Sequence, residues 1–117
     1  MKTNELTGVA LDWAVAEASG TPIYRSGKTL SRMDVDGGIY WQPSTDWSQG
    51  GPIIEREEIG VQCWSFHSMP WKASIEGDTD AGVALYEEYG PTPLIAAMRC
   101  YVASKLGDEI EIPKELT

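Results

Sequence analysis

The chain has 117 residues, which is enough for one compact unit, and residues 1–117 are predicted to form a single domain. Nine basic residues against 18 acidic ones give a formal net charge of −9. This charge disfavours direct binding to nucleic acid and to anionic membranes. No apolar run is long enough to span a membrane and no secretory signal is present, so we expect a cytoplasmic protein.

The first helix is predicted over residues 6–19. Leu11, Ala14 and Val15 recur at helical spacing, and Thr7 or Asn4 can cap the start. Gly20 stands where a left-handed C-cap belongs, and Pro22 prevents the helix from continuing.

Short strands are expected to follow. Residues 23–25 and 39–41 are the first candidates, with turns at residues 26–28 and at Gly37-Gly38. Alternating polarity predicts further strands over residues 59–66 and 71–76, followed by a polar connection over residues 76–80.

The last helix has the clearest boundaries. Thr92 can cap it, Pro93 suits its first turn, and Gly107 can end it. Its predicted apolar stripe leaves Arg99 and Lys105 for solvent or a ligand and comprises Leu94, Ala97, Met98, Tyr101, Val102 and Leu106. Residues 110–113 form an extended tail that can add an edge strand. The predicted fold is therefore α+β, with a small, mostly antiparallel sheet packed against an N-terminal and a C-terminal helix.

The cysteines and the histidine do not suggest a metal or redox site. Cys63 and Cys100 are far apart among apolar neighbours, so both are expected to be buried free thiols. His67, the only histidine, lacks the partners that zinc requires. We expect no metal and no cofactor.

The segment from Tyr40 to Glu58 is the most informative part of the chain. It places Trp41 and Trp47 around a Ser44-Thr45-Asp46 turn and then continues into Gly50-Gly51-Pro52. Turn residues give special backbone angles, whereas tryptophans give large rigid contact area. A connecting loop does not need the tryptophans, so we interpret this segment as a recognition loop.

Three segments together resemble the NinX family, small proteins of temperate phages and prophages of unknown function. The segments are residues 44–57, 6–16 and 90–102. The resemblance implies a phage accessory protein made in the host bacterial cytoplasm, and it transfers no catalytic residues.

The residues of the loop have the chemistry of a nucleotide-sized pocket. Indoles can stack on a base, carboxylates can bind ribose hydroxyls, and arginines can pair with phosphate. The alternative is that Trp41, Trp64 and Trp71 belong to the core and that Asp46 only caps a turn. The predicted ligand-binding residues are Trp41, Ser44, Thr45, Asp46, Trp47, Gln49, Gly50, Glu55, Arg56, Trp71, Thr92 and Arg99.

Three functions compete. The favoured one is a counter-defence sponge that sequesters a nucleotide signal of bacterial immunity, such as a cyclic ADP-ribose derivative or a cyclic oligonucleotide. The second is an acidic inhibitor or adaptor that binds a host enzyme. An enzyme is less favoured, because a lone His67 and no nucleophile elbow offer little for a catalytic triad. Asp46, Glu55 and Glu57 can nevertheless bind magnesium, as in a phosphodiesterase.

A homo-oligomer, most simply a dimer, is also expected. Five tryptophans give a chain of this size more apolar bulk than its core can readily bury.

Overall fold

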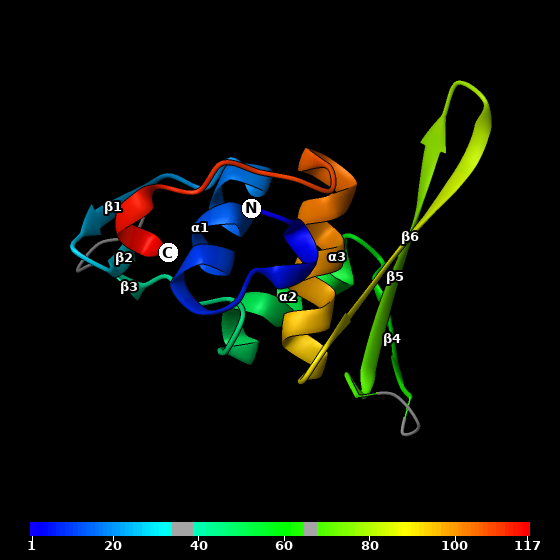
Figure 1. Ribbon diagram of the computed structural model, residues 1–117, viewed down its shortest axis with the longest axis horizontal. Helices are drawn as coiled ribbons and strands as arrows, with labels where there is room; N and C mark the ends of the chain where they lie inside the picture. The colour runs from blue at the N-terminus through cyan, green and yellow to red at the C-terminus, as the bar shows by residue number, and fades with distance from the viewer. Residues whose placement is uncertain (34–38, 65–67) are drawn as a thin grey trace.

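The computed structural model describes residues 1–33, 39–64 and 68–117. In these residues three α-helices lie between two three-stranded antiparallel sheets (Figure 1). The α+β class is confirmed. The arrangement differs from the prediction because the strands divide between two sheets and a third helix is present.

Helix α1, Gly8–Ser19, follows the predicted boundaries closely. Its C-cap is Gly20, at φ +69°, a left-handed conformation that glycine adopts at little cost. Thr7 holds the N-cap position without a capping hydrogen bond from its side chain. Leu11, Ala14 and Val15 are fully buried, so the predicted apolar face forms part of the core.

The first sheet has the order β1-β2-β3, formed by Ile23–Ser26, Thr29–Arg32 and Ile39–Tyr40. A tight turn at Gly27 joins β1 to β2, as predicted. The strand expected at residues 39–41 is confirmed in its first two residues, whereas the turn expected at Gly37-Gly38 lies outside the described residues.

Helix α2, Trp47–Arg56, occupies the segment that was expected to be a loop. Asp46 caps the helix, because its carboxylate accepts hydrogen bonds from the backbone N–H and the hydroxyl of Ser48. Gly50 and Ile53 are buried on its inner face. Ser44 and Thr45 do lie in a turn, as predicted, but this turn leads into a helix that tertiary packing stabilises.

The second sheet has the order β4-β5-β6, formed by Gly60–Cys63, Trp71–Thr79 and Gly82–Gly90. The polar connection expected over residues 76–80 is wrong, because β5 continues to Thr79 and pairs with β6 along its whole length. The far end of this hairpin projects beyond the helices, at the right of Figure 1. Cys63 is exposed, contrary to expectation, because β4 is an edge strand.

Helix α3, Pro93–Leu106, packs against α1, α2, β5 and β6. Its predicted ends are confirmed, since the Thr92 hydroxyl accepts a hydrogen bond from the Ile95 N–H and Gly107 is the C-cap. Met98, Val102 and Cys100 are fully buried. Leu106, by contrast, is 38% exposed and does not belong to the apolar stripe.

The N-terminal residues lie against the segment that follows α3. Lys2 and Glu109 form an isolated antiparallel bridge, and the Met1 ammonium donates to the Ile110 carbonyl oxygen at 2.9 Å. The tail makes this bridge instead of the edge strand that was considered, and it ends in a 3₁₀ helix at Lys114–Leu116 beside β1 (Figure 1).

Candidate functional site

Trp41 stands at the centre of the candidate site. Its side chain is only 5% exposed, and its indole N–H donates to the Asp12 backbone oxygen at 2.8 Å. This bond fixes the ring against α1. Trp41 lines two cavities and so forms a wall that they share.

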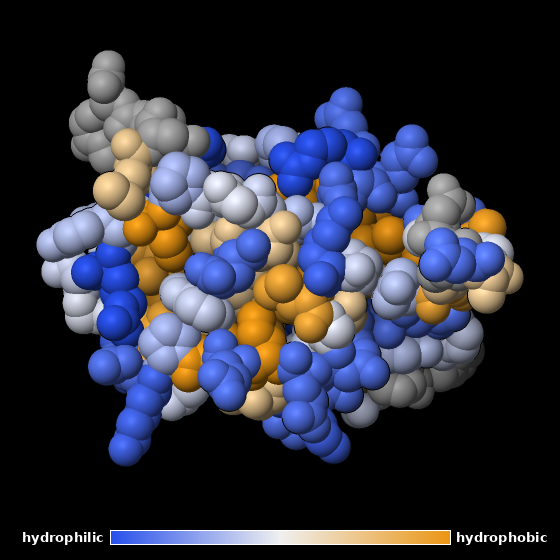
Figure 2. All heavy atoms as spheres, turned by 90° about the horizontal axis from the view of Figure 1, so that it is seen from above, coloured by the Kyte–Doolittle hydropathy of each residue, from blue (hydrophilic) through white to orange (hydrophobic). Residues whose placement is uncertain are grey.

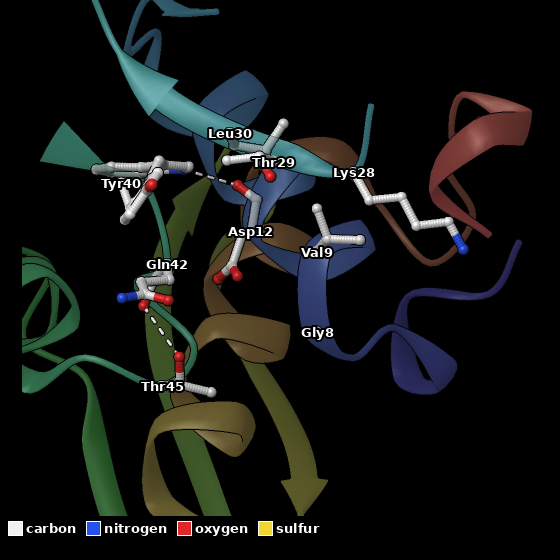
Figure 3. A pocket seen from close by; sticks show the side chains of 10 residues that line it. Gly8, Val9, Asp12, Lys28, Thr29, Leu30, Tyr40, Gln42 and Thr45 are labelled. Atoms are coloured by element: carbon white, nitrogen blue, oxygen red, sulfur yellow. Dashed lines mark hydrogen bonds between the residues drawn. The ribbon is translucent and has the colours of Figure 1, made fainter. Parts of the chain in front are cut away.

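The larger cavity, which we call the Asp12 pocket, has a volume of about 390 Å³. This volume falls within the range of sites for small organic ligands. Its lining comes from the start of α1, from β2 and from the chain after β3 (Figure 3): Gly8, Val9, Asp12, Lys28, Thr29, Leu30, Tyr40, Trp41, Gln42 and Thr45.

Asp12 is the buried carboxylic acid of this pocket. It is 5% exposed, and one carboxylate oxygen, Oδ1, accepts the Ser44 backbone N–H at 2.8 Å. The carboxylate points away from Leu30 and toward the Gln42–Thr45 turn (Figure 3). Within the described part of the chain, Oδ2 has no hydrogen-bond donor of good geometry. It is therefore available to a donor on a ligand.

Burial raises the pKa of Asp12 from 3.8 to about 6, because removing a carboxylate from water disfavours its charged form. The backbone N–H and the nearby hydroxyl of Ser44 oppose this shift. That hydroxyl is itself buried and makes no hydrogen bond of good geometry with the described residues. The Ser44 hydroxyl thus lies beside the Asp12 carboxylate and favours its charged form.

The rest of the Asp12 pocket combines an aromatic ring with polar groups. Tyr40 is 66% exposed, so its ring is open to stacking. Gln42 and Thr45 lie at the same end, while Lys28 lies at the opposite end, beyond Val9 (Figure 3). An aromatic surface, a hydrogen-bonding edge and a cation are therefore spread along one cavity.

A second cavity, the Arg56 pocket, has a volume of about 160 Å³. It lies between the end of α1, β2 and α2. It brings together three predicted site residues, Trp41, Gln49 and Arg56, and its full lining is Ser19, Thr21, Arg32, Trp41, Ser48, Gln49, Pro52, Ile53 and Arg56.

A third cavity, the Trp47 groove, has a volume of about 210 Å³ and lies beside the start of α3. Trp47 is 56% exposed there, on the first residue of α2. Four predicted site residues line the groove, namely Ser44, Thr45, Trp47 and Thr92, together with Pro93, Leu94 and Ile95.

Several predicted site residues have structural roles instead. Arg99 is 6% exposed, and its guanidinium donates to the backbone oxygens of Leu6 and Tyr89, so it does not face solvent as expected. Gly50 is buried between Pro43 and Leu94 and permits close helix packing. Trp71 is half-buried on β5, in the other sheet.

Asp46 and Glu55 belong to α2. The Asp46 carboxylate bonds to Ser48 as the helix cap, and Glu55 is exposed on the last turn. Glu57, the third residue of the magnesium hypothesis, pairs with Arg56 and Lys105. In the described chain no three histidine, cysteine or acidic side chains gather in a way that suits a metal ion.

Of the ten residues that line the Asp12 pocket, the sequence predicted only Trp41 and Thr45; the eight others include Asp12, Lys28, Tyr40 and Gln42. One signal was present. Asp12 is an acidic residue placed between Leu11 and Trp13, in a helix segment whose other residues are mostly apolar. A carboxylate in that position is either paired or functional.

The relationship to known proteins is consistent with this architecture. The family described as "Bacteriophage P22, NinX" matches residues 2–105, nearly the whole chain. The chain belongs to this NinX family. No curated protein matches it.

One solved structure that resembles this NinX chain is a crystal structure of a phage protein from Bacillus cereus, with a TM-score of 0.54 and 13% sequence identity. The similarity covers 95% of this chain and 93% of the other. At this identity it establishes a shared fold. None of the described helices combines the length and apolar character needed to cross a bilayer.

Proposed function

We propose that this NinX protein binds a small nucleotide-like ligand in the Asp12 pocket and acts by sequestering it in the host cytoplasm. The observation that carries the proposal is the buried Asp12 carboxylate with one unused oxygen at the wall of a cavity of about 390 Å³. Vicinal ribose hydroxyls or the amino edge of a base are suitable donors for that oxygen. The exposed ring of Tyr40 supplies a surface for stacking.

The phage family supports a role in counter-defence. Bacterial immune signalling uses nucleotides, and a protein made by a phage gains from removing them. A cyclic ADP-ribose derivative or a cyclic oligonucleotide has the rings, hydroxyls and phosphates that the cavities around Trp41 suit. The proposal is binding without catalysis, because the pocket offers recognition groups and no paired nucleophile and base among its described residues.

The test begins with capture of the ligand. Purified protein is incubated with lysate from infected cells in which a nucleotide-based defence is active, then washed, heat-denatured and analysed by mass spectrometry. We expect the wild type to release a nucleotide-like compound. Absence of any released small molecule would contradict the proposal.

Matched variants locate the site. Asp12→Asn keeps the shape and the acceptor for Ser44 but removes the charge, and we expect about tenfold weaker binding of the released compound by calorimetry. Glu17→Gln, at an exposed position of the same helix, is the control. Tyr40→Ala is paired with Tyr24→Ala, since both rings are more than half exposed on the first sheet. Equal affinities in each pair would rule out this pocket.

A second function is favoured by one specific observation. The Trp47 groove places an exposed indole beside Pro93 and Ile95, and aromatic anchors next to apolar grooves are common at protein interfaces. A host enzyme bound there is the adaptor or inhibitor alternative. Native mass spectrometry of the captured complex distinguishes a bound protein from a bound small molecule. Trp47→Ala should abolish binding of the host protein and leave binding of the small molecule unchanged.

A further inference from the structure

The side chains that line the Arg56 pocket are unusual for this molecule. The chain has 18 acidic and nine basic residues, so its surface is mainly negative. Among the described residues that line the pocket there are two arginines, Arg32 and Arg56, and no acid. By contrast, a neighbouring cavity that Arg56 also lines, with Lys105, includes Glu57, Glu58 and Glu76, and the cavity between the N-terminal residues and β6 includes Glu88, Asp108 and Glu109.

The two guanidinium groups are held in different ways. The Arg32 guanidinium lies 5.7 Å from the centroid of the Trp41 ring, a cation–π contact that orients it along the shared wall. Arg56 contacts Glu57 through Nε at 3.1 Å and keeps its two terminal nitrogens for other acceptors. A guanidinium with two adjacent N–H groups fits an oxyanion in a bidentate manner.

Hydroxyl groups complete the polar wall. Ser19 Oγ and Thr21 Oγ1 lie 2.7 Å apart at the end of α1, whereas the Ser48 hydroxyl, on the first turn of α2, already donates to Asp46. The Gln49 amide is already engaged with the backbone of Tyr40 and Gln42, so it supports the wall and is not available to a ligand.

We propose that the Arg56 pocket is an oxyanion-binding site for a phosphate or pyrophosphate group. The arginines, the hydroxyl pair and the small volume all suit that group, and the described lining adds no carboxylate to the repulsion that a net charge of −9 gives. Trp41 separates this site from the Asp12 pocket. A nucleotide can therefore place its base and ribose on one side of the indole and its phosphates on the other, and this second step rests on the proposed function.

Inorganic pyrophosphate is the probe for the site alone. It is titrated into uniformly ¹⁵N-labelled protein at constant ionic strength, against chloride, while the arginine Nε–Hε resonances are followed by NMR. We expect saturable shifts at Arg56 and Arg32, with little change at Arg25, which lies at an exposed ion pair with Glu115. Shifts that are linear in concentration or equal at all arginines would overturn the proposal.

Variants sharpen the test. Arg56→Gln should weaken pyrophosphate binding about tenfold, because a charged hydrogen-bond donor is lost, whereas Arg25→Gln should leave it unchanged. Arg56 is exposed, so the variant is expected to fold, and an unchanged melting temperature verifies this. Thr21→Val, which removes one hydroxyl at similar volume, should weaken binding by a smaller factor. Equal affinities in Arg56→Gln and Arg25→Gln would also overturn the site.

Adenosine separates this proposal from the proposed function. It has a base and a ribose but no phosphate, so it reports on the Asp12 pocket alone. Adenosine binding that Asp12→Asn weakens, together with no saturable pyrophosphate binding, leaves the proposed function standing and removes the oxyanion site. Pyrophosphate binding without adenosine binding gives the opposite result.

Discussion

The buried carboxyl group of Asp12 makes the free energy of unfolding depend on pH. Its folded pKa is about 6, above the ordinary value of 3.8, so the folded state holds this proton more tightly than the unfolded state. The contribution of Asp12 to stability is therefore greatest below pH 4 and is lost as the pH rises through about 6. A ligand that donates to the carboxylate should in turn bind less well below that pH.

Asp12→Asn removes this dependence and keeps an acceptor for the Ser44 N–H. Between pH 4 and pH 6 the unfolding free energy of the wild type should fall by about 2 kcal/mol relative to the variant, measured by urea denaturation at each pH. Glu17→Gln, on the exposed face of α1, serves as the reference. A difference that is constant or that grows with pH would contradict the assignment.

Substitution of Met98, again a single residue, tests the packing of the core. Its side chain is fully buried on α3, so Met98→Ala should lower the unfolding free energy by about 2–5 kcal/mol through lost burial and a residual cavity. Met33, which is 63% exposed, provides the matched control, and Met33→Ala should change stability little. Chemical denaturation of both variants measures the contrast, and similar losses in the two would show that α3 packs by another face.

At the scale of elements, the adjacent glycines of α2 have opposite roles. A Cβ on Gly50 would lie 2.6 Å from Leu94 Cδ2 and closer still to the Pro43 carbonyl oxygen. A Cβ on Gly51 would lie 3.8 Å from the Trp47 ring, an ordinary contact. Gly50 therefore fixes how closely α2 approaches α3, whereas Gly51 has no such constraint.

Alanine substitutions separate the two roles. Gly50→Ala should destabilise the protein by about 1–3 kcal/mol or more through overpacking. Gly51→Ala should be neutral or should stabilise α2 by up to about 1 kcal/mol, because alanine has the higher helix propensity. Thermal unfolding followed by circular dichroism decides the order of stability. The reverse order would mean that α2 does not pack as described.

Helices α3 and α2 show what could and could not be predicted from the sequence. The ends of α3 were predictable because Thr92, Pro93 and Gly107 act through local hydrogen bonds and backbone angles. The helical state of α2 was not predictable, since Gly50-Gly51-Pro52 disfavours a helix locally. The contacts that stabilise α2 come from Pro43 and Leu94. Tertiary contacts overrode local propensity.

The β5–β6 hairpin and the Asp12 pocket were missed for related reasons. Glu76 lies on an exposed position of β5, so its polarity resembled a connection, although its strand partner Leu85 continues the ladder. The pocket unites residues from α1, β2 and the chain after β3. Residues of the aromatic segment line several cavities, but neither Asp46 nor Trp47 lines the Asp12 pocket, whose buried acid comes from a helix that the sequence presents as core.

At the scale of the whole molecule, the oligomeric state stays a prediction. Trp47, Val83 and Leu85 are each more than half exposed. Figure 2 shows hydrophobic atoms reaching one face in several separate places between charged side chains. Two copies can cover such areas, and a two-fold dimer is the simplest arrangement.

Light scattering after size-exclusion chromatography measures the mass directly. We expect twice the 12.8 kDa of one chain at micromolar concentration. Added salt should strengthen the association, because it screens the mutual repulsion of two chains with a net charge of −9. A mass that stays at 12.8 kDa as the concentration rises would rule out the dimer.

The projecting hairpin also provides an attachment point. Its turn, Asp80-Ala81, is exposed at the far end of β5 and β6, on the opposite side of the helices from β1, β2 and β3 (Figure 1). Exposed turns tolerate inserted segments because few contacts depend on them. An affinity peptide placed between Asp80 and Ala81 would immobilise the protein by this arm, with the cavities around Trp41 open to a flowing lysate.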